Sequence, residues 1–121
     1  MAYVKNILLV GETVKVKEFQ QSLRRAGAAV TLVGDTTAAL AAARQDRPDG
    51  IVFVVPVYWE SVADFVAAIR REPTLAAVPI VYLGDFIEAN DQLILKRQGV
   101  HTLTLGPVPP AEAVRYILKV I

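Results

Sequence analysis

The sequence predicts an α/β fold: a doubly wound, five-stranded parallel sheet with helices on both faces. Short runs of bulky apolar residues without polar alternation recur along the chain, which is typical of strands buried on both faces. Each run is followed by a segment with apolar residues at helical spacing, so that strands and helices alternate through all 121 residues. We expect a single domain that spans residues 1–121.

The run Gly50–Pro56 is predicted to be the central strand. It places Ile51-Val52-Phe53-Val54-Val55 in succession, between Asp49 and Pro56. A strand that is apolar on both faces needs helices on both sides and belongs in the middle of its sheet. This requirement favours the strand order 2-1-3-4-5, and ligand sites of such sheets lie at the carboxyl ends of the strands.

Four further strands are predicted from similar runs. The last of them alternates more than the others, which indicates a position nearer an edge of the sheet. They are Tyr3–Val10, Ala29–Val33, Val78–Leu83 ending at Gly84, and Val100–Leu105.

Five helices are predicted from apolar residues three and four positions apart and from residues typical of helix ends. Trp59 and the preceding Tyr58 are left in a loop above the sheet. The expected helices are one from Glu12-Thr13 to Gly27; Thr37–Gln45 with Thr36 as its cap and Leu40 inward; one from Val62 with Ser61 as its cap and Phe65, Val66 and Ile69 inward; the carboxyl-terminal part of 85–98, closed by Gly99; and one from Pro110 to the end of the chain.

Composition excludes several classes of function. The net charge is +1, and the 21% of charged residues have mixed signs, which argues against nucleic-acid binding. No apolar run approaches the roughly 20 residues of a membrane span, and no signal sequence is present, so we expect a cytoplasmic protein without membrane partners. With no cysteine and one histidine, His101, we expect no metal site and no cofactor.

The chain resembles the receiver domain of two-component response regulators, the CheY-like fold, over nearly all of its length. The resemblance lies in framing segments that are moderately specific only when taken together. These segments are Ile7-Leu8-Leu9-Val10 before an acidic turn, Arg47-Pro48-Asp49 before the third strand, Val78-Pro79-Ile80-Val81 in the fourth, and Gly99 through Pro107 around the fifth.

The functional positions implied by this resemblance depart from the family's pattern. Gly11 and Glu12 stand at the positions of the acidic pair that holds Mg²⁺ in receivers, and Val54 stands at the position of the phosphoacceptor aspartate. Three further positions are substituted and one is retained: Gly84 replaces the Ser/Thr, Leu103 the aromatic switch residue, Gly106 the lysine, and Pro107 is kept. The resemblance implies a cis bond between Gly106 and Pro107.

The substituted residues cannot perform receiver chemistry. Aspartyl phosphorylation needs a carboxylate nucleophile, Mg²⁺ needs carboxylate ligands, and the phosphoryl charge needs cationic partners. We therefore interpret the chain as a degenerate pseudo-receiver that is not an enzyme. Asp49 and Asp85 are the carboxylates that could replace the missing phosphoacceptor. Asp49 lies roughly 16 Å from Val54 at the rise per residue of a strand, and Asp85 is better explained as a helix cap. A receiver that takes phosphate on such a carboxylate is the third hypothesis.

The first hypothesis is therefore a protein–protein interaction module in a signalling assembly. The resemblance points to the face formed by the fourth helix, fifth strand and fifth helix, about Phe86–Lys119, which is also a surface for homodimer formation. The candidate interaction residues are Tyr58, Trp59, Phe86, Lys96, Arg97, Arg115 and Lys119.

The alternative is a small-ligand sensor. Gly11, Gly84 and Gly106 are expected around one crevice, where three absent side chains leave space for a ligand, or for Tyr58 or Trp59 to fold in. The simpler explanation is that each glycine serves the turn at its strand end. No phosphate loop rich in Ser or Thr follows the first strand, which disfavours flavin, and no cobalamin motif is present.

Overall fold

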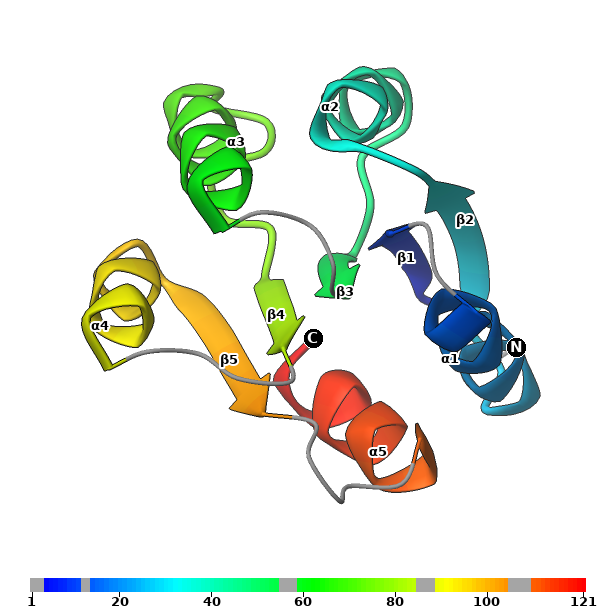
Figure 1. The fold of residues 1–121 in the computed structure, drawn as a ribbon. Helices are drawn as coiled ribbons and strands as arrows, with labels where there is room; N and C mark the ends of the chain where they lie inside the picture. The colour runs from blue at the N-terminus through cyan, green and yellow to red at the C-terminus, as the bar shows by residue number, and fades with distance from the viewer. Residues whose placement is uncertain (1–3, 12–13, 55–58, 85–88, 105–109) are drawn as a thin grey trace.

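The structure is a computed structural model that describes residues 4–11, 14–54, 59–84, 89–104 and 110–121 (Figure 1). Within these residues, strands and helices alternate as the sequence predicts. In chain order they are β1 (Asn6–Val10), α1 (Val14–Arg25), β2 (Ala29–Val33), α2 (Thr36–Gln45), β3 (Gly50–Val54), α3 (Trp59–Arg71), β4 (Ile80–Gly84), α4 (Ala89–Arg97), β5 (Val100–Thr104) and α5 (Pro110–Val120).

The strands form one parallel sheet in the order β2-β1-β3-β4-β5, which confirms the predicted topology. All five residues of β3 are buried, and so are all five of β4. The continuous apolar run was therefore a correct signal for the centre of the sheet. β5 lies at an edge, as its alternation predicts.

Helices cover both faces of the sheet (Figure 1). Ile51 and Phe53 of β3 belong to an apolar cluster shared with α2, α3 and α4, whereas Val52 and Val54 belong to a second cluster shared with α1 and α5. Successive side chains of a strand point to opposite faces, so one strand supplies both clusters. The rings of Phe53 and Phe65 meet edge to face at 5.2 Å and join β3 to α3.

Helix α3 begins earlier than predicted. Phe65, Val66 and Ile69 are buried as expected, but the helix starts at Trp59. Ser61 is therefore inside the helix and is not its cap, and Trp59 is helical rather than part of a loop. The predicted capping box had Asp64 in place of the usual Glu or Gln, and this weak local signal did not fix the boundary.

Helix α2 also differs from its prediction at its first residue and on its buried face. The cap is Asp35, whose Oδ1 accepts from the Ala38 N–H at 2.7 Å, and Thr36 is the first helical residue. A carboxylate at this position is also favoured by the helix dipole. The buried residues are Ala39 and Ala43, and Leu40 is only half-buried. Leu40 still packs against the apolar cluster on this side of the sheet, as predicted, beside the small side chains of α2.

The first and fourth strands begin later than predicted, whereas the second has its predicted bounds. β1 begins at Asn6 rather than Tyr3, because no strand is assigned to residues 4 and 5. β4 begins at Ile80 because the backbone groups of Val78 are already used: its N–H donates to Leu75 O at 3.1 Å, and its carbonyl accepts from Arg70 Nη1 at 2.8 Å. β5 ends at Thr104.

Two glycines close helices in the left-handed backbone conformation, as the sequence predicts. Gly27 follows α1 with φ 94°, and Gly99 follows α4 with φ 78°. Arg70 holds the end of α4 in place, since its Nε donates to Gln98 O and its Nη1 to the carbonyls of Ala76 and Val78. Burial lowers the pKa of Arg70, and these backbone acceptors offset the cost of its partial desolvation.

Candidate functional site at the carboxyl edge of the sheet

The ends of β1, β3 and β4 meet at one edge of the sheet. Val10 is in register with Phe53, and Val54 with Leu83, so the chain leaves these strands at neighbouring points. The structure therefore places Gly11, Val54 and Gly84 along the same edge, as the topology predicts. All three are buried.

The position next to Gly11 is closed. A Cβ built on Gly11 would lie 2.5 Å from Cγ2 of Val16 and 3.0 Å from the carbonyl oxygen of Val54. Real Cβ atoms essentially never approach another heavy atom as closely as the first of these distances. Val16 comes from the first turns of α1 and is itself buried, so the helix seals the place where an acidic side chain would begin. At Gly11 the predicted open crevice is wrong.

Val54 is surrounded by apolar side chains. Its exposed fraction is 0%, and it belongs to the cluster that α1 and α5 share with β1 and β4. Neighbours on the adjacent strands, Val10 and Leu83, are equally inaccessible. This part of the edge therefore offers neither a nucleophile nor a ligand to a phosphoryl group or a cation. Among the described residues, no group of three His, Cys, Asp or Glu side chains is placed to hold a metal ion.

Asp49 is engaged at the opposite edge of the sheet. Its Oδ2 accepts from the N–H of Asn6 at 2.7 Å, and its own N–H donates to the carbonyl of Asn6 at 2.8 Å. The carboxylate thus fixes the start of β1 beside β3. This role explains why Asp49 precedes the central strand, and it was missed at the level of sequence.

Several predicted site residues lie outside the part of the chain that the structure describes. They are Glu12, Tyr58, Asp85, Phe86, Gly106 and Pro107. The filling of a crevice by Tyr58 or Trp59, and the cis bond before Pro107, therefore stay predictions.

The predicted interaction face includes exposed cations. Lys96 and Arg97 end α4, while Arg115 and Lys119 lie on α5, and all four are exposed. Leu103 is half-buried against the cluster around α5. His101 is exposed on β5, as expected for a residue without a role in the core.

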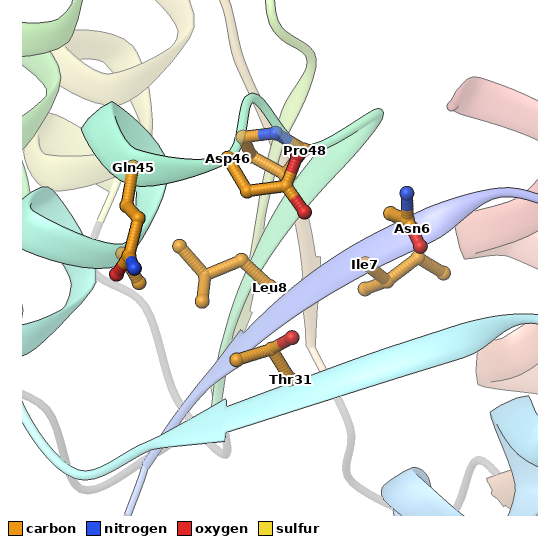
Figure 2. Close-up of a pocket in the computed structure, with 8 residues that line it drawn as sticks. Asn6, Ile7, Leu8, Thr31, Gln45, Asp46 and Pro48 are labelled. Atoms are coloured by element: carbon orange, nitrogen blue, oxygen red, sulfur yellow. The ribbon is translucent and has the colours of Figure 1, made fainter.

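The cavity drawn in Figure 2 lies away from the carboxyl edge. It is about 450 Å³ in volume, between α2 and the first two strands. Leu8 of β1 and Thr31 of β2 line it together with Gln45 and Asp46 at the end of α2. Nothing in the sequence pattern distinguished this cavity, because it depends on how far α2 stands from β2.

Comparison with solved structures gives the fold a family context. The chemotaxis protein CheY4 of Vibrio cholerae superposes with a TM-score of 0.86 at 22% identity, over 98% of this chain and 100% of that one. The fold is that of a receiver domain. The receiver domain of the sensor histidine kinase PA1611 from Pseudomonas aeruginosa, described with a magnesium ion in its active-site cleft, has a TM-score of 0.77 at 25% identity and covers 98% of both chains.

A third receiver-fold neighbour is the phosphorylated cyanobacterial phytochrome response regulator RcpA. It has a TM-score of 0.79 at 23% identity, over 95% of this chain and 89% of that one. No model of a protein family matches the sequence, and no curated protein matches it. The receiver fold is thus found at a low sequence identity. At such identities the pattern of apolar residues is kept, whereas individual site residues can differ. In the part of the chain that the structure describes, no helix has the length and apolarity to cross a membrane.

Proposed function

We propose that this chain is a pseudo-receiver that acts as a phosphorylation-independent protein–protein interaction module in two-component-type signalling or regulation. The observation that carries the proposal is the burial of Val54, at 0% exposure, where the resemblance to receivers places the phosphoacceptor aspartate. A valine cannot form an acyl phosphate, and the described side chains packed around it are apolar. In this proposal the chain is not an enzyme and takes no cofactor.

The closure at Gly11 supports the same conclusion for the metal. The Pseudomonas aeruginosa receiver is described with magnesium in its cleft, and Mg²⁺ is held through carboxylates and water. In this chain the first position of the expected acidic pair is Gly11, and Val16 takes the space that a side chain there would need. Glu12 alone is a poor site for Mg²⁺.

A receiver fold that cannot be phosphorylated can still bind a protein partner through its surface. We assign partner binding to the face formed by α4, β5 and α5. The exposed cations Lys96, Arg97, Arg115 and Lys119 favour a protein partner with acidic side chains. If the partner is a second copy of this chain, the two copies pair symmetrically through this face. Nucleic acid and membrane are not partners in this proposal.

The alternative, a ligand sensor with a glycine-lined crevice, is not favoured by the described residues. The space beside Gly11 is occupied, and the cavity in Figure 2 lies elsewhere.

Treatment with acetyl phosphate and Mg²⁺, followed by intact-mass measurement, tests the loss of phosphoryl chemistry. We expect no added phosphoryl group on this chain under conditions that modify a conventional receiver assayed in parallel. Addition of a phosphoryl group to any carboxylate would overturn the proposal. For the recognition face, we expect reversal of charge at Arg115 and Lys119 to abolish partner binding without lowering the unfolding temperature, and unchanged binding would contradict that assignment.

A further inference from the structure

The outer edge of β2 presents backbone hydrogen-bonding groups that no other described strand uses. Ala29 N–H donates to Lys5 O at 2.9 Å, and Val33 O accepts from Gly11 N at 3.0 Å, so residues 29, 31 and 33 turn their backbone groups toward β1. Backbone groups alternate in direction along a strand, and Val30 and Leu32 therefore point theirs away from the sheet. In the described part of the chain, no strand lies beyond β2.

This edge lacks the features that normally prevent strand pairing. Natural edge strands are protected by charged side chains, proline, bulges or a covering element. The sequence of β2 is Ala-Val-Thr-Leu-Val, without a charge or a proline, and no bulge interrupts its register with β1. Four of its five residues are apolar, and both valines and the threonine are β-branched, which favours extended structure.

The face of β2 toward α2 is also uncovered at Ala29 and Thr31, whereas Val33 packs against the apolar cluster on that side of the sheet. Helix α2 packs against β1, and the cavity of about 450 Å³ separates it from Thr31 (Figure 2). Ala29 and Thr31 are exposed as a result. A second strand placed beside β2 would thus meet accessible backbone and accessible side chains.

We propose that two copies of the chain pair antiparallel through β2, about a two-fold axis at Thr31, and so join their sheets into one. In this register Val30 of one copy lies opposite Leu32 of the other. Each such pair exchanges two hydrogen bonds, so that four bonds satisfy all the outward groups of Val30 and Leu32 in both copies. Thr31 then faces Thr31 of the second copy as a non-hydrogen-bonded pair, in which the two side chains lie close together and a threonine pair is favourable.

Charge at the two ends of β2 favours this antiparallel orientation. Arg24 lies in the last turn of α1 just before the strand and is exposed, while exposed Asp35 follows the strand. Antiparallel pairing brings the basic end of one strand beside the acidic end of the other, twice. Parallel pairing would instead bring like charges together. The occupant that fits the edge is therefore a second copy of this chain, and the surface is distinct from the α4–β5–α5 face.

Cysteine cross-linking tests the register directly, because the wild-type chain has no cysteine. Thr31→Cys places two sulfurs on the axis, with the Cα atoms about 4.5 Å apart, a separation that suits a disulfide. We expect this variant to form a disulfide-linked dimer under mild oxidation. The matched control is His101→Cys, exposed on the opposite edge strand, which we expect to form no disulfide-linked dimer. Faster cross-linking of His101→Cys would overturn the proposal and favour the α4–β5–α5 face instead.

Sedimentation of two Thr31 variants supplies a second test. Thr31→Lys puts like charges opposite each other, and we expect it to weaken self-association by at least about tenfold. Thr31→Val has nearly the same shape and keeps the wild-type association. Both exposed substitutions should leave the unfolding temperature unchanged. A wild-type chain that stays monomeric at high concentration, or equal association of both variants, would overturn β2 pairing and leave the phosphoryl-transfer result unaffected.

Discussion

At the scale of single residues, the candidate site is defined by what its side chains exclude. Val54 is an apolar residue that is fully buried at the carboxyl edge of the sheet, and Gly11 has no room for a side chain. Val16 lies at helical spacing from Phe19 and Leu23, on one apolar face of α1. Its contact with Gly11 depends on how α1 is seated over β1, which no periodicity specifies.

An acidic residue introduced at position 54 is expected to destabilise the folded state. Val54→Asp buries a carboxylate without a partner, and we predict a loss of about 3 to 5 kcal/mol in unfolding free energy at neutral pH. Burial raises the pKa of this new carboxyl in the folded state above its value in the unfolded state. Below the unfolded-state pKa the carboxyl is protonated in both states, so its ionisation adds nothing to the loss of stability. As pH rises from the unfolded-state pKa to the folded-state pKa, the loss of stability grows.

Denaturant unfolding at several pH values measures this effect. The control Val54→Ala removes two methyl groups and should cost roughly 2 kcal/mol at every pH. A Val54→Asp variant whose deficit relative to this control does not change between acidic and neutral pH would show that position 54 is hydrated.

The closure at Gly11 predicts a coupling between two residues. Gly11→Ala forces a Cβ against Val16 and should destabilise the fold by about 1 to 3 kcal/mol. In a Val16→Ala background the same substitution should cost markedly less, because the obstructing methyl group is gone. A double-mutant cycle measures the difference, and strictly additive losses would mean that Val16 does not occupy this space.

At the scale of elements, the nature and order of the helices and strands followed from the sequence, but several ends did not. α2 is capped by Asp35 where Thr36 was predicted, and α3 starts at Trp59 where Val62 was predicted. Adjacent residues with capping side chains compete, and the backbone path out of the preceding strand decides which of them reaches an amide.

The capping assignment gives a direct comparison between neighbouring residues. Asp35→Ala removes the acceptor of the Ala38 N–H and should lower the unfolding free energy by about 1 kcal/mol. Thr36→Ala, which changes the cap that sequence alone favoured, should cost only a few tenths of that amount. Thermal or urea unfolding of the two variants separates these outcomes, and a larger loss for Thr36→Ala would reverse the assignment.

At the scale of the whole molecule, two apolar clusters lie on opposite faces of one sheet. β3 contributes alternate residues to both clusters, so that neither face can lose its packing while the other remains intact. The chain end is tied to the same sheet, since Lys5 Nζ donates to Ile121 O at 2.8 Å and the Ile121 side chain packs on Gly50.

This arrangement predicts a single cooperative unfolding transition, as expected for one domain. The only tryptophan of the sequence, Trp59, lies in α3, so its fluorescence follows the unfolding of that helix, whereas far-ultraviolet circular dichroism reports on all helices. We expect the two signals to give coincident urea curves. Separated midpoints would indicate that the faces unfold independently and would contradict the single-domain prediction.

The sequence by itself determined the fold class, the strand order and the central place of β3, because continuous apolar runs and helical spacing are local patterns that translate directly into burial. It also determined that Val54 cannot accept a phosphoryl group. Only the tertiary structure decided that Val16 closes the place beside Gly11, that Asp49 clamps Asn6, and that β2 keeps an open edge beside α2. Each of these contacts joins residues whose meeting depends on how a helix or a neighbouring strand is seated, and a one-dimensional pattern does not encode that distance.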